Sequence, residues 1–525
     1  MNASSDSTNW TVLLALVVAL AGIAAAVGIP AFVAARKRAL AAGMTYRSGL
    51  LRGTQGVARR APPGPPPSLA PAHSEGCAAA TAAAKRMWTH VDQVALVQTL
   101  ALVPFLPILA TIVGLLDPEI VGIRAWFAMV LGWAFFLLPM FAVLSEPRPG
   151  RTWTLALLAL VALAALMLFF NPGMMVLVAI SSGQPALAAW LVARRSARAV
   201  GPALFLAVAG GTASAVTGIV LGFSAFAAAN SGTGVLAFIV LAGGGIALGA
   251  VVAGAVLIVL SRSYQRHDLG DNEIKAMGWA GAFFVFFAIV QSPGLGNFTA
   301  IVLLCVPAYW LLVRMGYRVL PPPATNPRRM LFLRTFRAGG EARSVLRAVE
   351  GPWRVVGPVD VVAAPDVAAD TLEIDELETL LRGRTLELFR TADVGDTHPD
   401  PDSRYRVIEH FCAADAWTDV VARLIEDATV ILFDLRGLQS SNRGAAIEVG
   451  LILDTAPAER VVWIIDANTD RIYLQSVVSE RWKRLAEHSP NRTASRIPLT
   501  DVIEVSAPDA LLLRVADAAF CHAAG

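Results

Sequence analysis

Long uncharged apolar runs dominate the chain up to Pro327, and only short ones follow it. A helix that crosses a bilayer needs roughly 20 largely apolar residues. Nine runs approach this length, at residues 10–35, 94–116, 125–144, 152–170, 173–193, 201–223, 234–260, 277–291 and 297–313. The pattern predicts an α-helical polytopic membrane domain of about nine spans, with residues 1–35 as the first helix and 94–318 as an eight-span bundle.

Basic side chains lie almost entirely in alternate loops of this predicted domain. Of the 20 Lys and Arg residues up to Pro327, only Arg124 falls on the opposite side. The first apolar run has no basic region before it and is followed directly by Arg36, Lys37 and Arg38, which indicates an anchor rather than a signal peptide. The pattern therefore predicts a multi-pass protein of the inner (plasma) membrane, with its N-terminus outside and its C-terminal domain in the cytoplasm.

The first predicted cytoplasmic loop, residues 36–93, is basic and rich in proline. Nine basic residues stand against the single acid Glu75 between Arg36 and Arg86, and residues 61–67 are mostly proline. Such a composition favours an extended linker that helps to set the topology. The alternative is that the loop binds anionic lipid headgroups or the acidic C-terminal domain.

The predicted spans show little sign of coupled transport, because none has an ionisable residue in its interior. Residues Ser181–Pro185 break the fifth run, where they either line a polar cavity or form a simple proline kink. Small residues at four-residue spacing favour close helix packing, within the bundle or between protomers of a homo-oligomer. They are Gly210, Ser214 and Gly218, and likewise Gly245, Gly249 and Ala253.

After a Pro-rich linker at residues 319–327, the apolar runs shorten to strand length and alternate with helix-period stretches. The expected strands are Met330–Arg334, Trp353–Val362, Thr429–Asp434, Arg460–Asp466 and Val502–Val505. The expected helices are Ala342–Val349, Ile374–Leu381, Ala416–Glu426, Gly444–Leu453, Tyr473–Glu487 and Ala510–Phe520. This alternation predicts a cytoplasmic α/β domain at residues 328–525, with a mostly parallel sheet covered on both faces.

Composition separates the two halves further. The chain has 20 basic and 9 acidic residues up to Pro327, but 23 basic and 31 acidic residues after it. The overall charge of +3 therefore hides a basic membrane part and an acidic soluble part, and nothing in it favours a nucleic-acid partner. The four cysteines are far apart in sequence and are interpreted as isolated thiols.

The richest candidate for chemistry follows the strand ending at Phe433. A polar loop from Asp434 runs into a helix that begins near Gly444, and Glu448 lies about one turn inside that helix. Free amides at a helix start favour an anion or a sugar oxygen. Glu448 could accept from sugar hydroxyls or act as a base or nucleophile, and the simpler alternative is a solvated helix acid.

Other candidates surround this edge of the sheet. Asp434 faces a ligand or caps its loop, and Arg334 and Arg436 bind phosphate or pair with local acids such as Asp434. Ser441, Asn442 and Gly444 contact substrate or form the helix start, and Asp466 and Asn468 end the next strand. His398 and His410 lack metal-ligand spacing, and no P-loop, zinc-protease helix or ordered Rossmann fingerprint follows Pro327.

These residues resemble two related groups, the TIR domains and the nucleoside 2-deoxyribosyltransferase-like proteins. The similar positions are Trp417, Val420, Ile425, Ala428, the strand Val430–Asp434, the loop Ser440–Asn442, and Gly444, Glu448 and Gly450. The resemblance implies a flavodoxin-like fold in which Glu448 matches the glutamate that attacks the sugar C1′ or performs the essential step of NAD cleavage. Met330–Phe336 also resembles the first strand of TIR-like domains tethered to bacterial membranes.

The expected function is that of a membrane-anchored protein whose cytoplasmic domain binds a nucleotide or nucleoside and cleaves its N-glycosidic bond. Glu448 would be catalytic, and NAD or a nucleotide would be substrate or ligand rather than a resident cofactor. One alternative is a non-catalytic nucleotide sensor that regulates the membrane bundle. A second is a channel or transporter that uses the broken fifth span.

Overall fold

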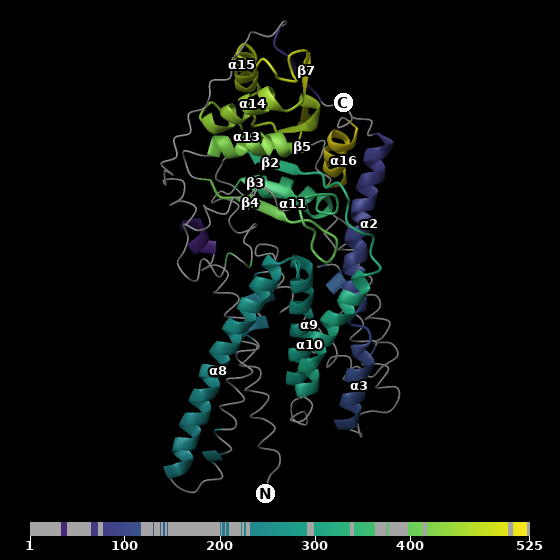
Figure 1. The fold of residues 1–525 in the computed structure, drawn as a ribbon, viewed down its shortest axis with the longest axis vertical. Coiled ribbons are helices and arrows are strands. Elements are labelled where there is room, and N and C mark those ends of the chain that lie inside the picture. The colour runs from purple at the N-terminus through teal and green to yellow at the C-terminus, as the bar shows by residue number, and fades with distance from the viewer. Residues whose placement is uncertain are drawn as a thin grey trace. The chain divides into compact units, whose positions relative to one another are not determined.

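The computed structural model divides the chain into two compact units (Figure 1). A helical unit takes in residues 1–33, 92–320 and 372–378, and an α/β unit takes in 34–91, 321–371 and 379–525. The structure describes residues 33–38, 65–71, 77–116, 232–290, 299–335, 341–362, 397–412, 417–501 and 508–521, with isolated positions between 130 and 226 and at 374 and 376.

Described helices coincide with four of the predicted spans. They are α2 (Ala78–Leu100), α3 (Phe105–Leu116), α8 (Gly232–Gln265), α9 (Asp271–Val290) and α10 (Thr299–Tyr317). Within the described residues, Ala78–Ile112 and Thr233–Gln265 are long and apolar enough to cross a membrane. The predicted span 94–116 is not one regular helix, because a turn at residues 101–104, which ends at Pro104, separates α2 from α3. The predicted spans 10–35, 125–144, 152–170, 173–193 and 201–223 lie wholly or largely outside the described residues.

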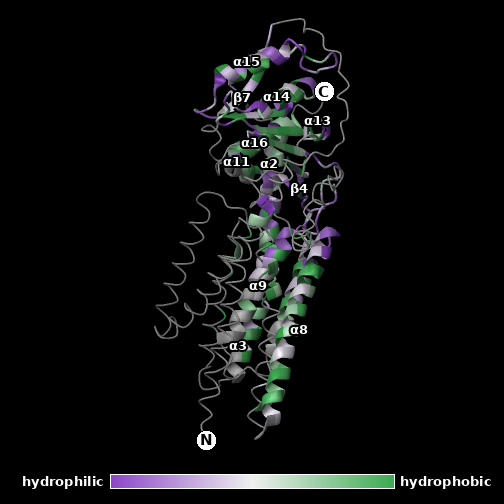
Figure 2. Ribbon diagram, turned by 90° about the vertical axis from the view of Figure 1, so that its left-hand side faces the viewer, coloured by the Kyte–Doolittle hydropathy of each residue, from purple (hydrophilic) through white to green (hydrophobic). Residues whose placement is uncertain are grey.

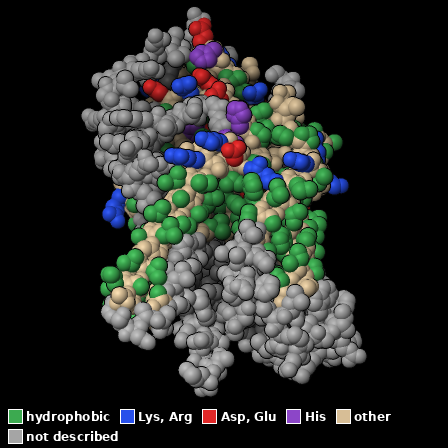
Figure 3. All heavy atoms as spheres, turned by 60° about the horizontal axis from the view of Figure 1, so that its bottom comes forward, with side chains coloured by type: hydrophobic (Ala, Val, Ile, Leu, Met, Phe, Trp, Pro, Cys, Tyr) green, Lys and Arg blue, Asp and Glu red, His purple; other side chains and the backbone are tan. Residues whose placement is uncertain are grey.

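Helix α8 has the surface expected of a helix in an apolar environment (Figure 2). Ala242, Gly245 and Gly249 are buried in one small-residue stripe, whereas Leu236 and Val251 are 64% and 67% exposed. Apolar side chains also cover much of the described helical surface in Figure 3. Contiguous exposed apolar faces of this kind mark membrane or protein contacts. The other small-residue seam, Gly210–Gly218, and the Ser181–Pro185 break lie outside the described part.

Seven strands form one sheet in the α/β unit, in the order β1-β7-β6-β5-β2-β3-β4. Every neighbouring pair is parallel. The strands are β1 (Ser68–Pro71), β2 (Met330–Arg334), β3 (Val359–Val362), β4 (Val407–His410), β5 (Val430–Asp434), β6 (Val461–Ile465) and β7 (Arg496–Asp501). The predicted class of a parallel α/β domain is therefore confirmed.

Both faces of the sheet are covered, which explains the uniformly apolar central strands. In β5, Ile431 and Phe433 join one buried cluster, and Val430 and Leu432 join the other, because successive side chains point to opposite faces. The first face packs against α13 (Trp417–Asp427), α14 (Arg443–Thr455) and α15 (Arg471–Trp482). The second packs against α11 (Glu341–Trp353), α16 (Pro508–Phe520) and the first half of α2.

Several predicted elements differ from the structure. The expected strand 353–362 is only β3, because Trp353 ends α11 and fills the core as a helical residue. β7 precedes the strand expected at Val502–Val505, which lies outside the described residues. His410 belongs to β4, a strand that is absent from the predicted elements. Most of the helix expected at 374–381 falls outside the described residues.

The segment between the first and second predicted spans contributes to the α/β unit and is more than a linker. β1 extends the sheet by pairing with β7, with Ser68 opposite Arg496. Met87 and Trp88 of α2 are buried in the core of the second face. Arg36 forms a buried ion pair with Glu409. The α/β unit therefore begins well before the predicted boundary at residue 328, because two distant parts of the chain complete it.

Candidate functional site

The order of the strands along the chain reverses direction between β2 and β5. β2 connects to β3 on one side of this point, whereas β5, β6 and β7 continue on the other side. Ligands of open parallel sheets bind outside the carboxyl ends of the strands at such a point. Arg334 and Asp434 end the two strands opposite each other, and the Thr335 N–H donates to the Asp434 carbonyl at 2.9 Å. The sequence-predicted residues Arg334 and Asp434 therefore do meet here.

Glu448 of α14 is buried close to this edge, with 2% of its surface exposed. Burial raises the pKa of Glu448 to about 8, and the positive charge of Arg334 opposes that rise only in part. Oε2 of Glu448 is buried and has no hydrogen-bond partner among the described residues. The interpretation of Glu448 as a solvated helix acid is wrong, because the side chain is inside the unit. A buried polar atom left unsatisfied is costly, and such atoms gather at functional sites.

Asp434 and Arg436 neutralise each other. Arg436 Nε donates to Asp434 Oδ1 at 2.9 Å, and Nη2 donates to Oδ2 at 2.8 Å, which is a two-point ion pair. The Arg436 carbonyl in turn accepts from the Thr335 hydroxyl at 3.0 Å. Arg436 was expected either to bind phosphate or to pair with a local acid, and the structure has the pairing with Asp434. The bond from Thr335 to the Arg436 carbonyl also ties the loop after β5 to the end of β2.

Asp466, directly after β6, braces the same loop. Its Oδ1 accepts from the Gly437 N–H at 2.8 Å and from the Thr469 hydroxyl at 2.7 Å. Burial alone would raise the pKa of Asp466, but these bonds and those from Asn468 outweigh it and lower the pKa. Gly437 has φ +62°, a left-handed conformation that favours glycine. Asp466 thus holds the site loop in place through a tight glycine turn.

The N-terminus of α14 is open. Asn442 stands at the N-cap position but makes no side-chain cap bond, because its Oδ1 accepts from the Gln439 N–H at 2.8 Å instead. A Cβ added at Gly444 would meet no atom within 4 Å. Ser441 is exposed beside it. Since the first amides of a helix lack intrahelical partners, this end can accept an anionic or hydroxyl group from a ligand.

Gly450, a position of the same resemblance, is explained by packing against Arg481 of the neighbouring helix. A Cβ at this position would lie 2.9 Å from Nε and 3.0 Å from Cδ of Arg481 on α15. The small residue therefore makes room for a neighbouring side chain of the protein. Of the two glycines near Glu448, Gly444 is the one at which a Cβ would face open space.

A second polar cluster escaped sequence analysis. Arg329 donates from Nε and Nη2 to the two carboxylate oxygens of Asp360, each at 3.0 Å, and His410 Nε2 is hydrogen-bonded to Asp360 Oδ1 at 2.8 Å. Burial would raise the pKa of Asp360, but the bonds from His410 and Arg329 lower it. The cluster joins β3 and β4, and only the parallel register, which places Val362 beside His410, brings it together.

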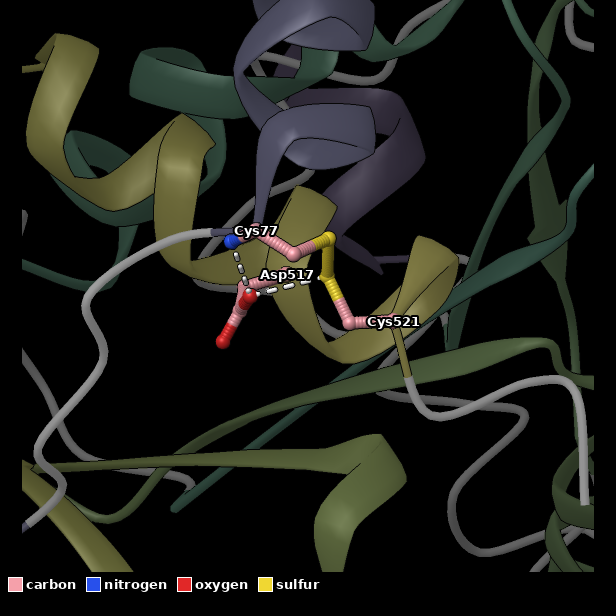
Figure 4. Close-up of side chains that lie close together, drawn as sticks. All are labelled: Cys77, Asp517 and Cys521. Carbon is pink, nitrogen blue, oxygen red and sulfur yellow. Dashed lines mark hydrogen bonds between the residues drawn. A yellow bond between two sulfur atoms is a disulfide. The ribbon is translucent and has the colours of Figure 1, made fainter.

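The expectation of isolated thiols is wrong for two cysteines. Cys77, just before α2, and Cys521, just after α16, form a disulfide with a Cα–Cα distance of 6.3 Å (Figure 4). The two cysteines are 444 residues apart in the sequence, so spacing could not predict the pair. They come together because α2 and α16 pack on the same face of the sheet. Cys305 and Cys412 are in no disulfide. Among the described residues, the only group with the composition of a metal site is Cys77, Asp517 and Cys521.

A comparison with known proteins found no matching family model, no matching curated protein and no matching solved structure. The functional conclusion therefore depends on the chain's own geometry.

Proposed function

We propose that this is a multi-pass membrane protein whose cytoplasmic α/β unit binds a nucleotide or nucleoside at the carboxyl ends of β2 and β5 and cleaves its N-glycosidic bond. The observation that carries the proposal is Glu448, a buried carboxyl group with an unsatisfied oxygen beside Arg334. Cleavage of this bond develops positive charge on the sugar, and a carboxylate beneath the ring stabilises it.

Topology supports the site and its fold class. The five strands β3-β2-β5-β6-β7 follow the order of flavodoxin-like folds, in which the ligand lies at the point between the first and third strands of the domain. At that point Arg334 and Asp434 end their strands, and the charge of Arg334 acts on Glu448. The open start of α14 at Gly444 supplies amides for a phosphate or sugar oxygen next to the carboxyl group.

Membrane attachment and orientation have separate support. The exposed apolar faces of α8 and the two helices of spanning length favour a bilayer partner. Residues 34–91 and 321–525 mostly belong to one unit, so the intervening chain must cross the membrane an even number of times. Eight crossings after an N-terminal helix that begins outside satisfy this condition and place the unit on the basic, cytoplasmic side.

The proposal is tested on the full-length protein in lipid nanodiscs, because residues 34–91 complete the α/β unit. Wild type and Glu448→Gln are incubated with NAD, nucleosides and nucleoside 5′-monophosphates, and free base is measured by chromatography. Glu480→Gln is the matched control, since this side chain on α15 is 69% exposed. Base release that Glu448→Gln abolishes and Glu480→Gln preserves is the expected result.

One observation favours a second candidate, a nucleotide sensor without catalysis. A carboxyl group with a pKa near 8 is mostly protonated at neutral pH, so it can donate a hydrogen bond to a ligand but is a poor nucleophile. Calorimetry on the same variants separates the two functions. Nucleotide binding without base release would favour the sensor.

A further inference from the structure

The disulfide between Cys77 and Cys521 joins the start of α2 to the end of α16. Cys77 immediately precedes α2, the helix that forms the first part of the apolar stretch Ala78–Ile112. Cys521 immediately follows α16, which packs on the sheet behind β5 and β6. The bond therefore attaches the start of a membrane-directed helix to a helix that lies against the strands of the candidate site.

Both helices are also packed into the same buried cluster on this face of the sheet. Met87 and Trp88 of α2 share a buried cluster with Leu512 and Val515 of α16. Each helix therefore has packing of its own on this face of the sheet, and the bond adds a covalent restraint between the two helices. Such a restraint changes how readily α2 separates from α16 and leaves the fold unchanged.

Surroundings of the two sulfur atoms suit reversible chemistry. Asp517 lies one helical turn before Cys521, and its Oδ1 accepts from the Cys77 N–H at 3.2 Å and lies 3.0 Å from Cys521 Sγ (Figure 4). On reduction, the Cys521 thiol has this carboxylate as a hydrogen-bond acceptor. Stabilisation of the reduced form makes a disulfide easier to reduce.

Exposure distinguishes this pair from Cys305, whereas Cys412 is also partly exposed. Cys77 and Cys521 are both partly exposed, whereas Cys305 is buried. Burial raises the pKa of the Cys412 thiol to about 12, so it is almost entirely unreactive at neutral pH. Once the bond is reduced, a small disulfide in solution can therefore reach the Cys77 and Cys521 thiols.

We propose that Cys77 and Cys521 form a thiol switch that locks α2 to α16 when oxidised and releases the restraint when reduced. The oxidant is a low-molecular-weight disulfide: one protein thiolate attacks it and expels one small thiol, and the second protein thiolate then displaces the other small thiol as the Cys77–Cys521 bond forms. One small disulfide is reduced to two thiols for each bond made. The inference rests on the proposed cytoplasmic location, where disulfides are usually redox-responsive, and not on the proposed catalysis.

Thiol counting in full-length protein tests reversibility. The protein in nanodiscs is equilibrated in buffers of reduced and oxidised glutathione, quenched with acid, denatured and labelled with maleimide-polyethylene glycol. Two adducts are expected in oxidising buffer and four in reducing buffer, with return to two on reoxidation. Four adducts in every buffer, or two even in millimolar dithiothreitol without denaturant, would overturn the proposal.

Limited proteolysis tests the restraint itself. Lys85 and Arg86 are exposed on α2, so trypsin can cut there only when this helix opens locally. Cutting is expected to be roughly tenfold slower or more in the oxidised protein. Cys77→Ser should match reduced wild type in any buffer, and Cys412→Ser should keep the redox response.

Two further results would reject the switch. Equal trypsin rates for oxidised and reduced wild type would show that the bond restrains nothing. Stoichiometric zinc in the reduced protein, measured by mass spectrometry and lost in Cys77→Ser, would show that the two thiols and Asp517 serve a metal instead.

Discussion

Glu448 is held inside the α/β unit beside Arg334, and its pKa of about 8 lies well above the ordinary value of 4.5. An unfolded chain ionises this carboxyl group near pH 4.5, whereas the folded chain keeps it protonated up to about pH 8. The folded state is therefore penalised progressively as the pH rises through this window. Stability and a reactive carboxylate are in conflict at this residue, as is common at functional sites.

Glu448→Gln should remove that penalty, because a glutamine side chain does not ionise. We expect the variant to be more stable than wild type by an increment that grows from pH 5 to pH 8, by several degrees in the unfolding midpoint. Thermal unfolding followed by tryptophan fluorescence at a series of pH values measures the difference. A constant difference between the two proteins across this range would contradict the burial of an ionisable group here.

At the scale of elements, α14 carries both glycines of the site motif, and the structure separates their roles. Gly444→Ala should leave stability unchanged or slightly higher, because its Cβ meets open space and alanine is the better helix residue. The same change should weaken ligand binding at the helix start. Gly450→Ala should lower stability modestly, because Arg481 must shift to make room.

Calorimetric titration and thermal unfolding of the two glycine variants test this assignment together. Loss of affinity in Gly444→Ala at full stability places a ligand at the start of α14. Unchanged affinity in that variant would remove the helix terminus from the site, whatever Gly450→Ala does.

The Asp360 cluster ties the outer strands to the sheet. The pKa of Asp360 is lowered by His410 and Arg329, so its stabilising effect is present above the unfolded pKa near 3.8 and is lost as the pH falls through the lower folded value. Asp360→Asn should cost about 3 kcal/mol at neutral pH, because His410 and Arg329 lose a buried charged partner. The deficit relative to wild type should shrink in acid.

Denaturant titration at neutral and acidic pH provides the measurement, with Glu426→Gln, an exposed acid on α13, as the control. A neutral-pH midpoint for Asp360→Asn equal to that of the control variant would mean that the cluster contributes no stability.

Sequence patterns predicted the central strands well and the edges poorly, for a physical reason. β2, β5 and β6 are buried on both faces, so each of them is a continuous apolar run in the sequence. β4 contains Glu409 and His410, whose partners Arg36 and Asp360 lie far away in sequence, and β1 is a short strand within a proline-rich loop. Local patterning does not encode such partners.

The site shows the same division. The loop after β5 and the position of Glu448 on a helix follow from the sequence. The neutralisation of Arg436 by Asp434 was one of two open alternatives, and the proximity of Arg334 to Glu448 needed the register of β2 and β5. The role of Gly450 could not be predicted, because Arg481, whose side chain needs the space, is on a different helix.

The α/β unit, formed by residues 34–91, 321–371 and 379–525, constrains the membrane topology that we propose. Fluorescent-protein fusions inserted in the 72–76 segment and after Gly525 should both fluoresce, and alkaline phosphatase at the same positions should be inactive. A fusion at the N-terminus should show the reverse. Opposite behaviour of the fusions in 72–76 and after Gly525 would mean an odd number of crossings between them. The two parts of the α/β unit would then lie on opposite sides of the membrane, which contradicts their packing in one unit.

We propose that the α/β unit uses Glu448 to cleave a glycosidic bond. The most direct measurement is the initial rate of base release by full-length wild type and Glu448→Gln, on the nucleotide or nucleoside that wild type cleaves fastest. We expect the variant to be slower by at least about a hundredfold, with an affinity for the ligand within a few-fold of wild type. Equal rates in the two proteins, or no base release by wild type from any member of the panel, would contradict the claim.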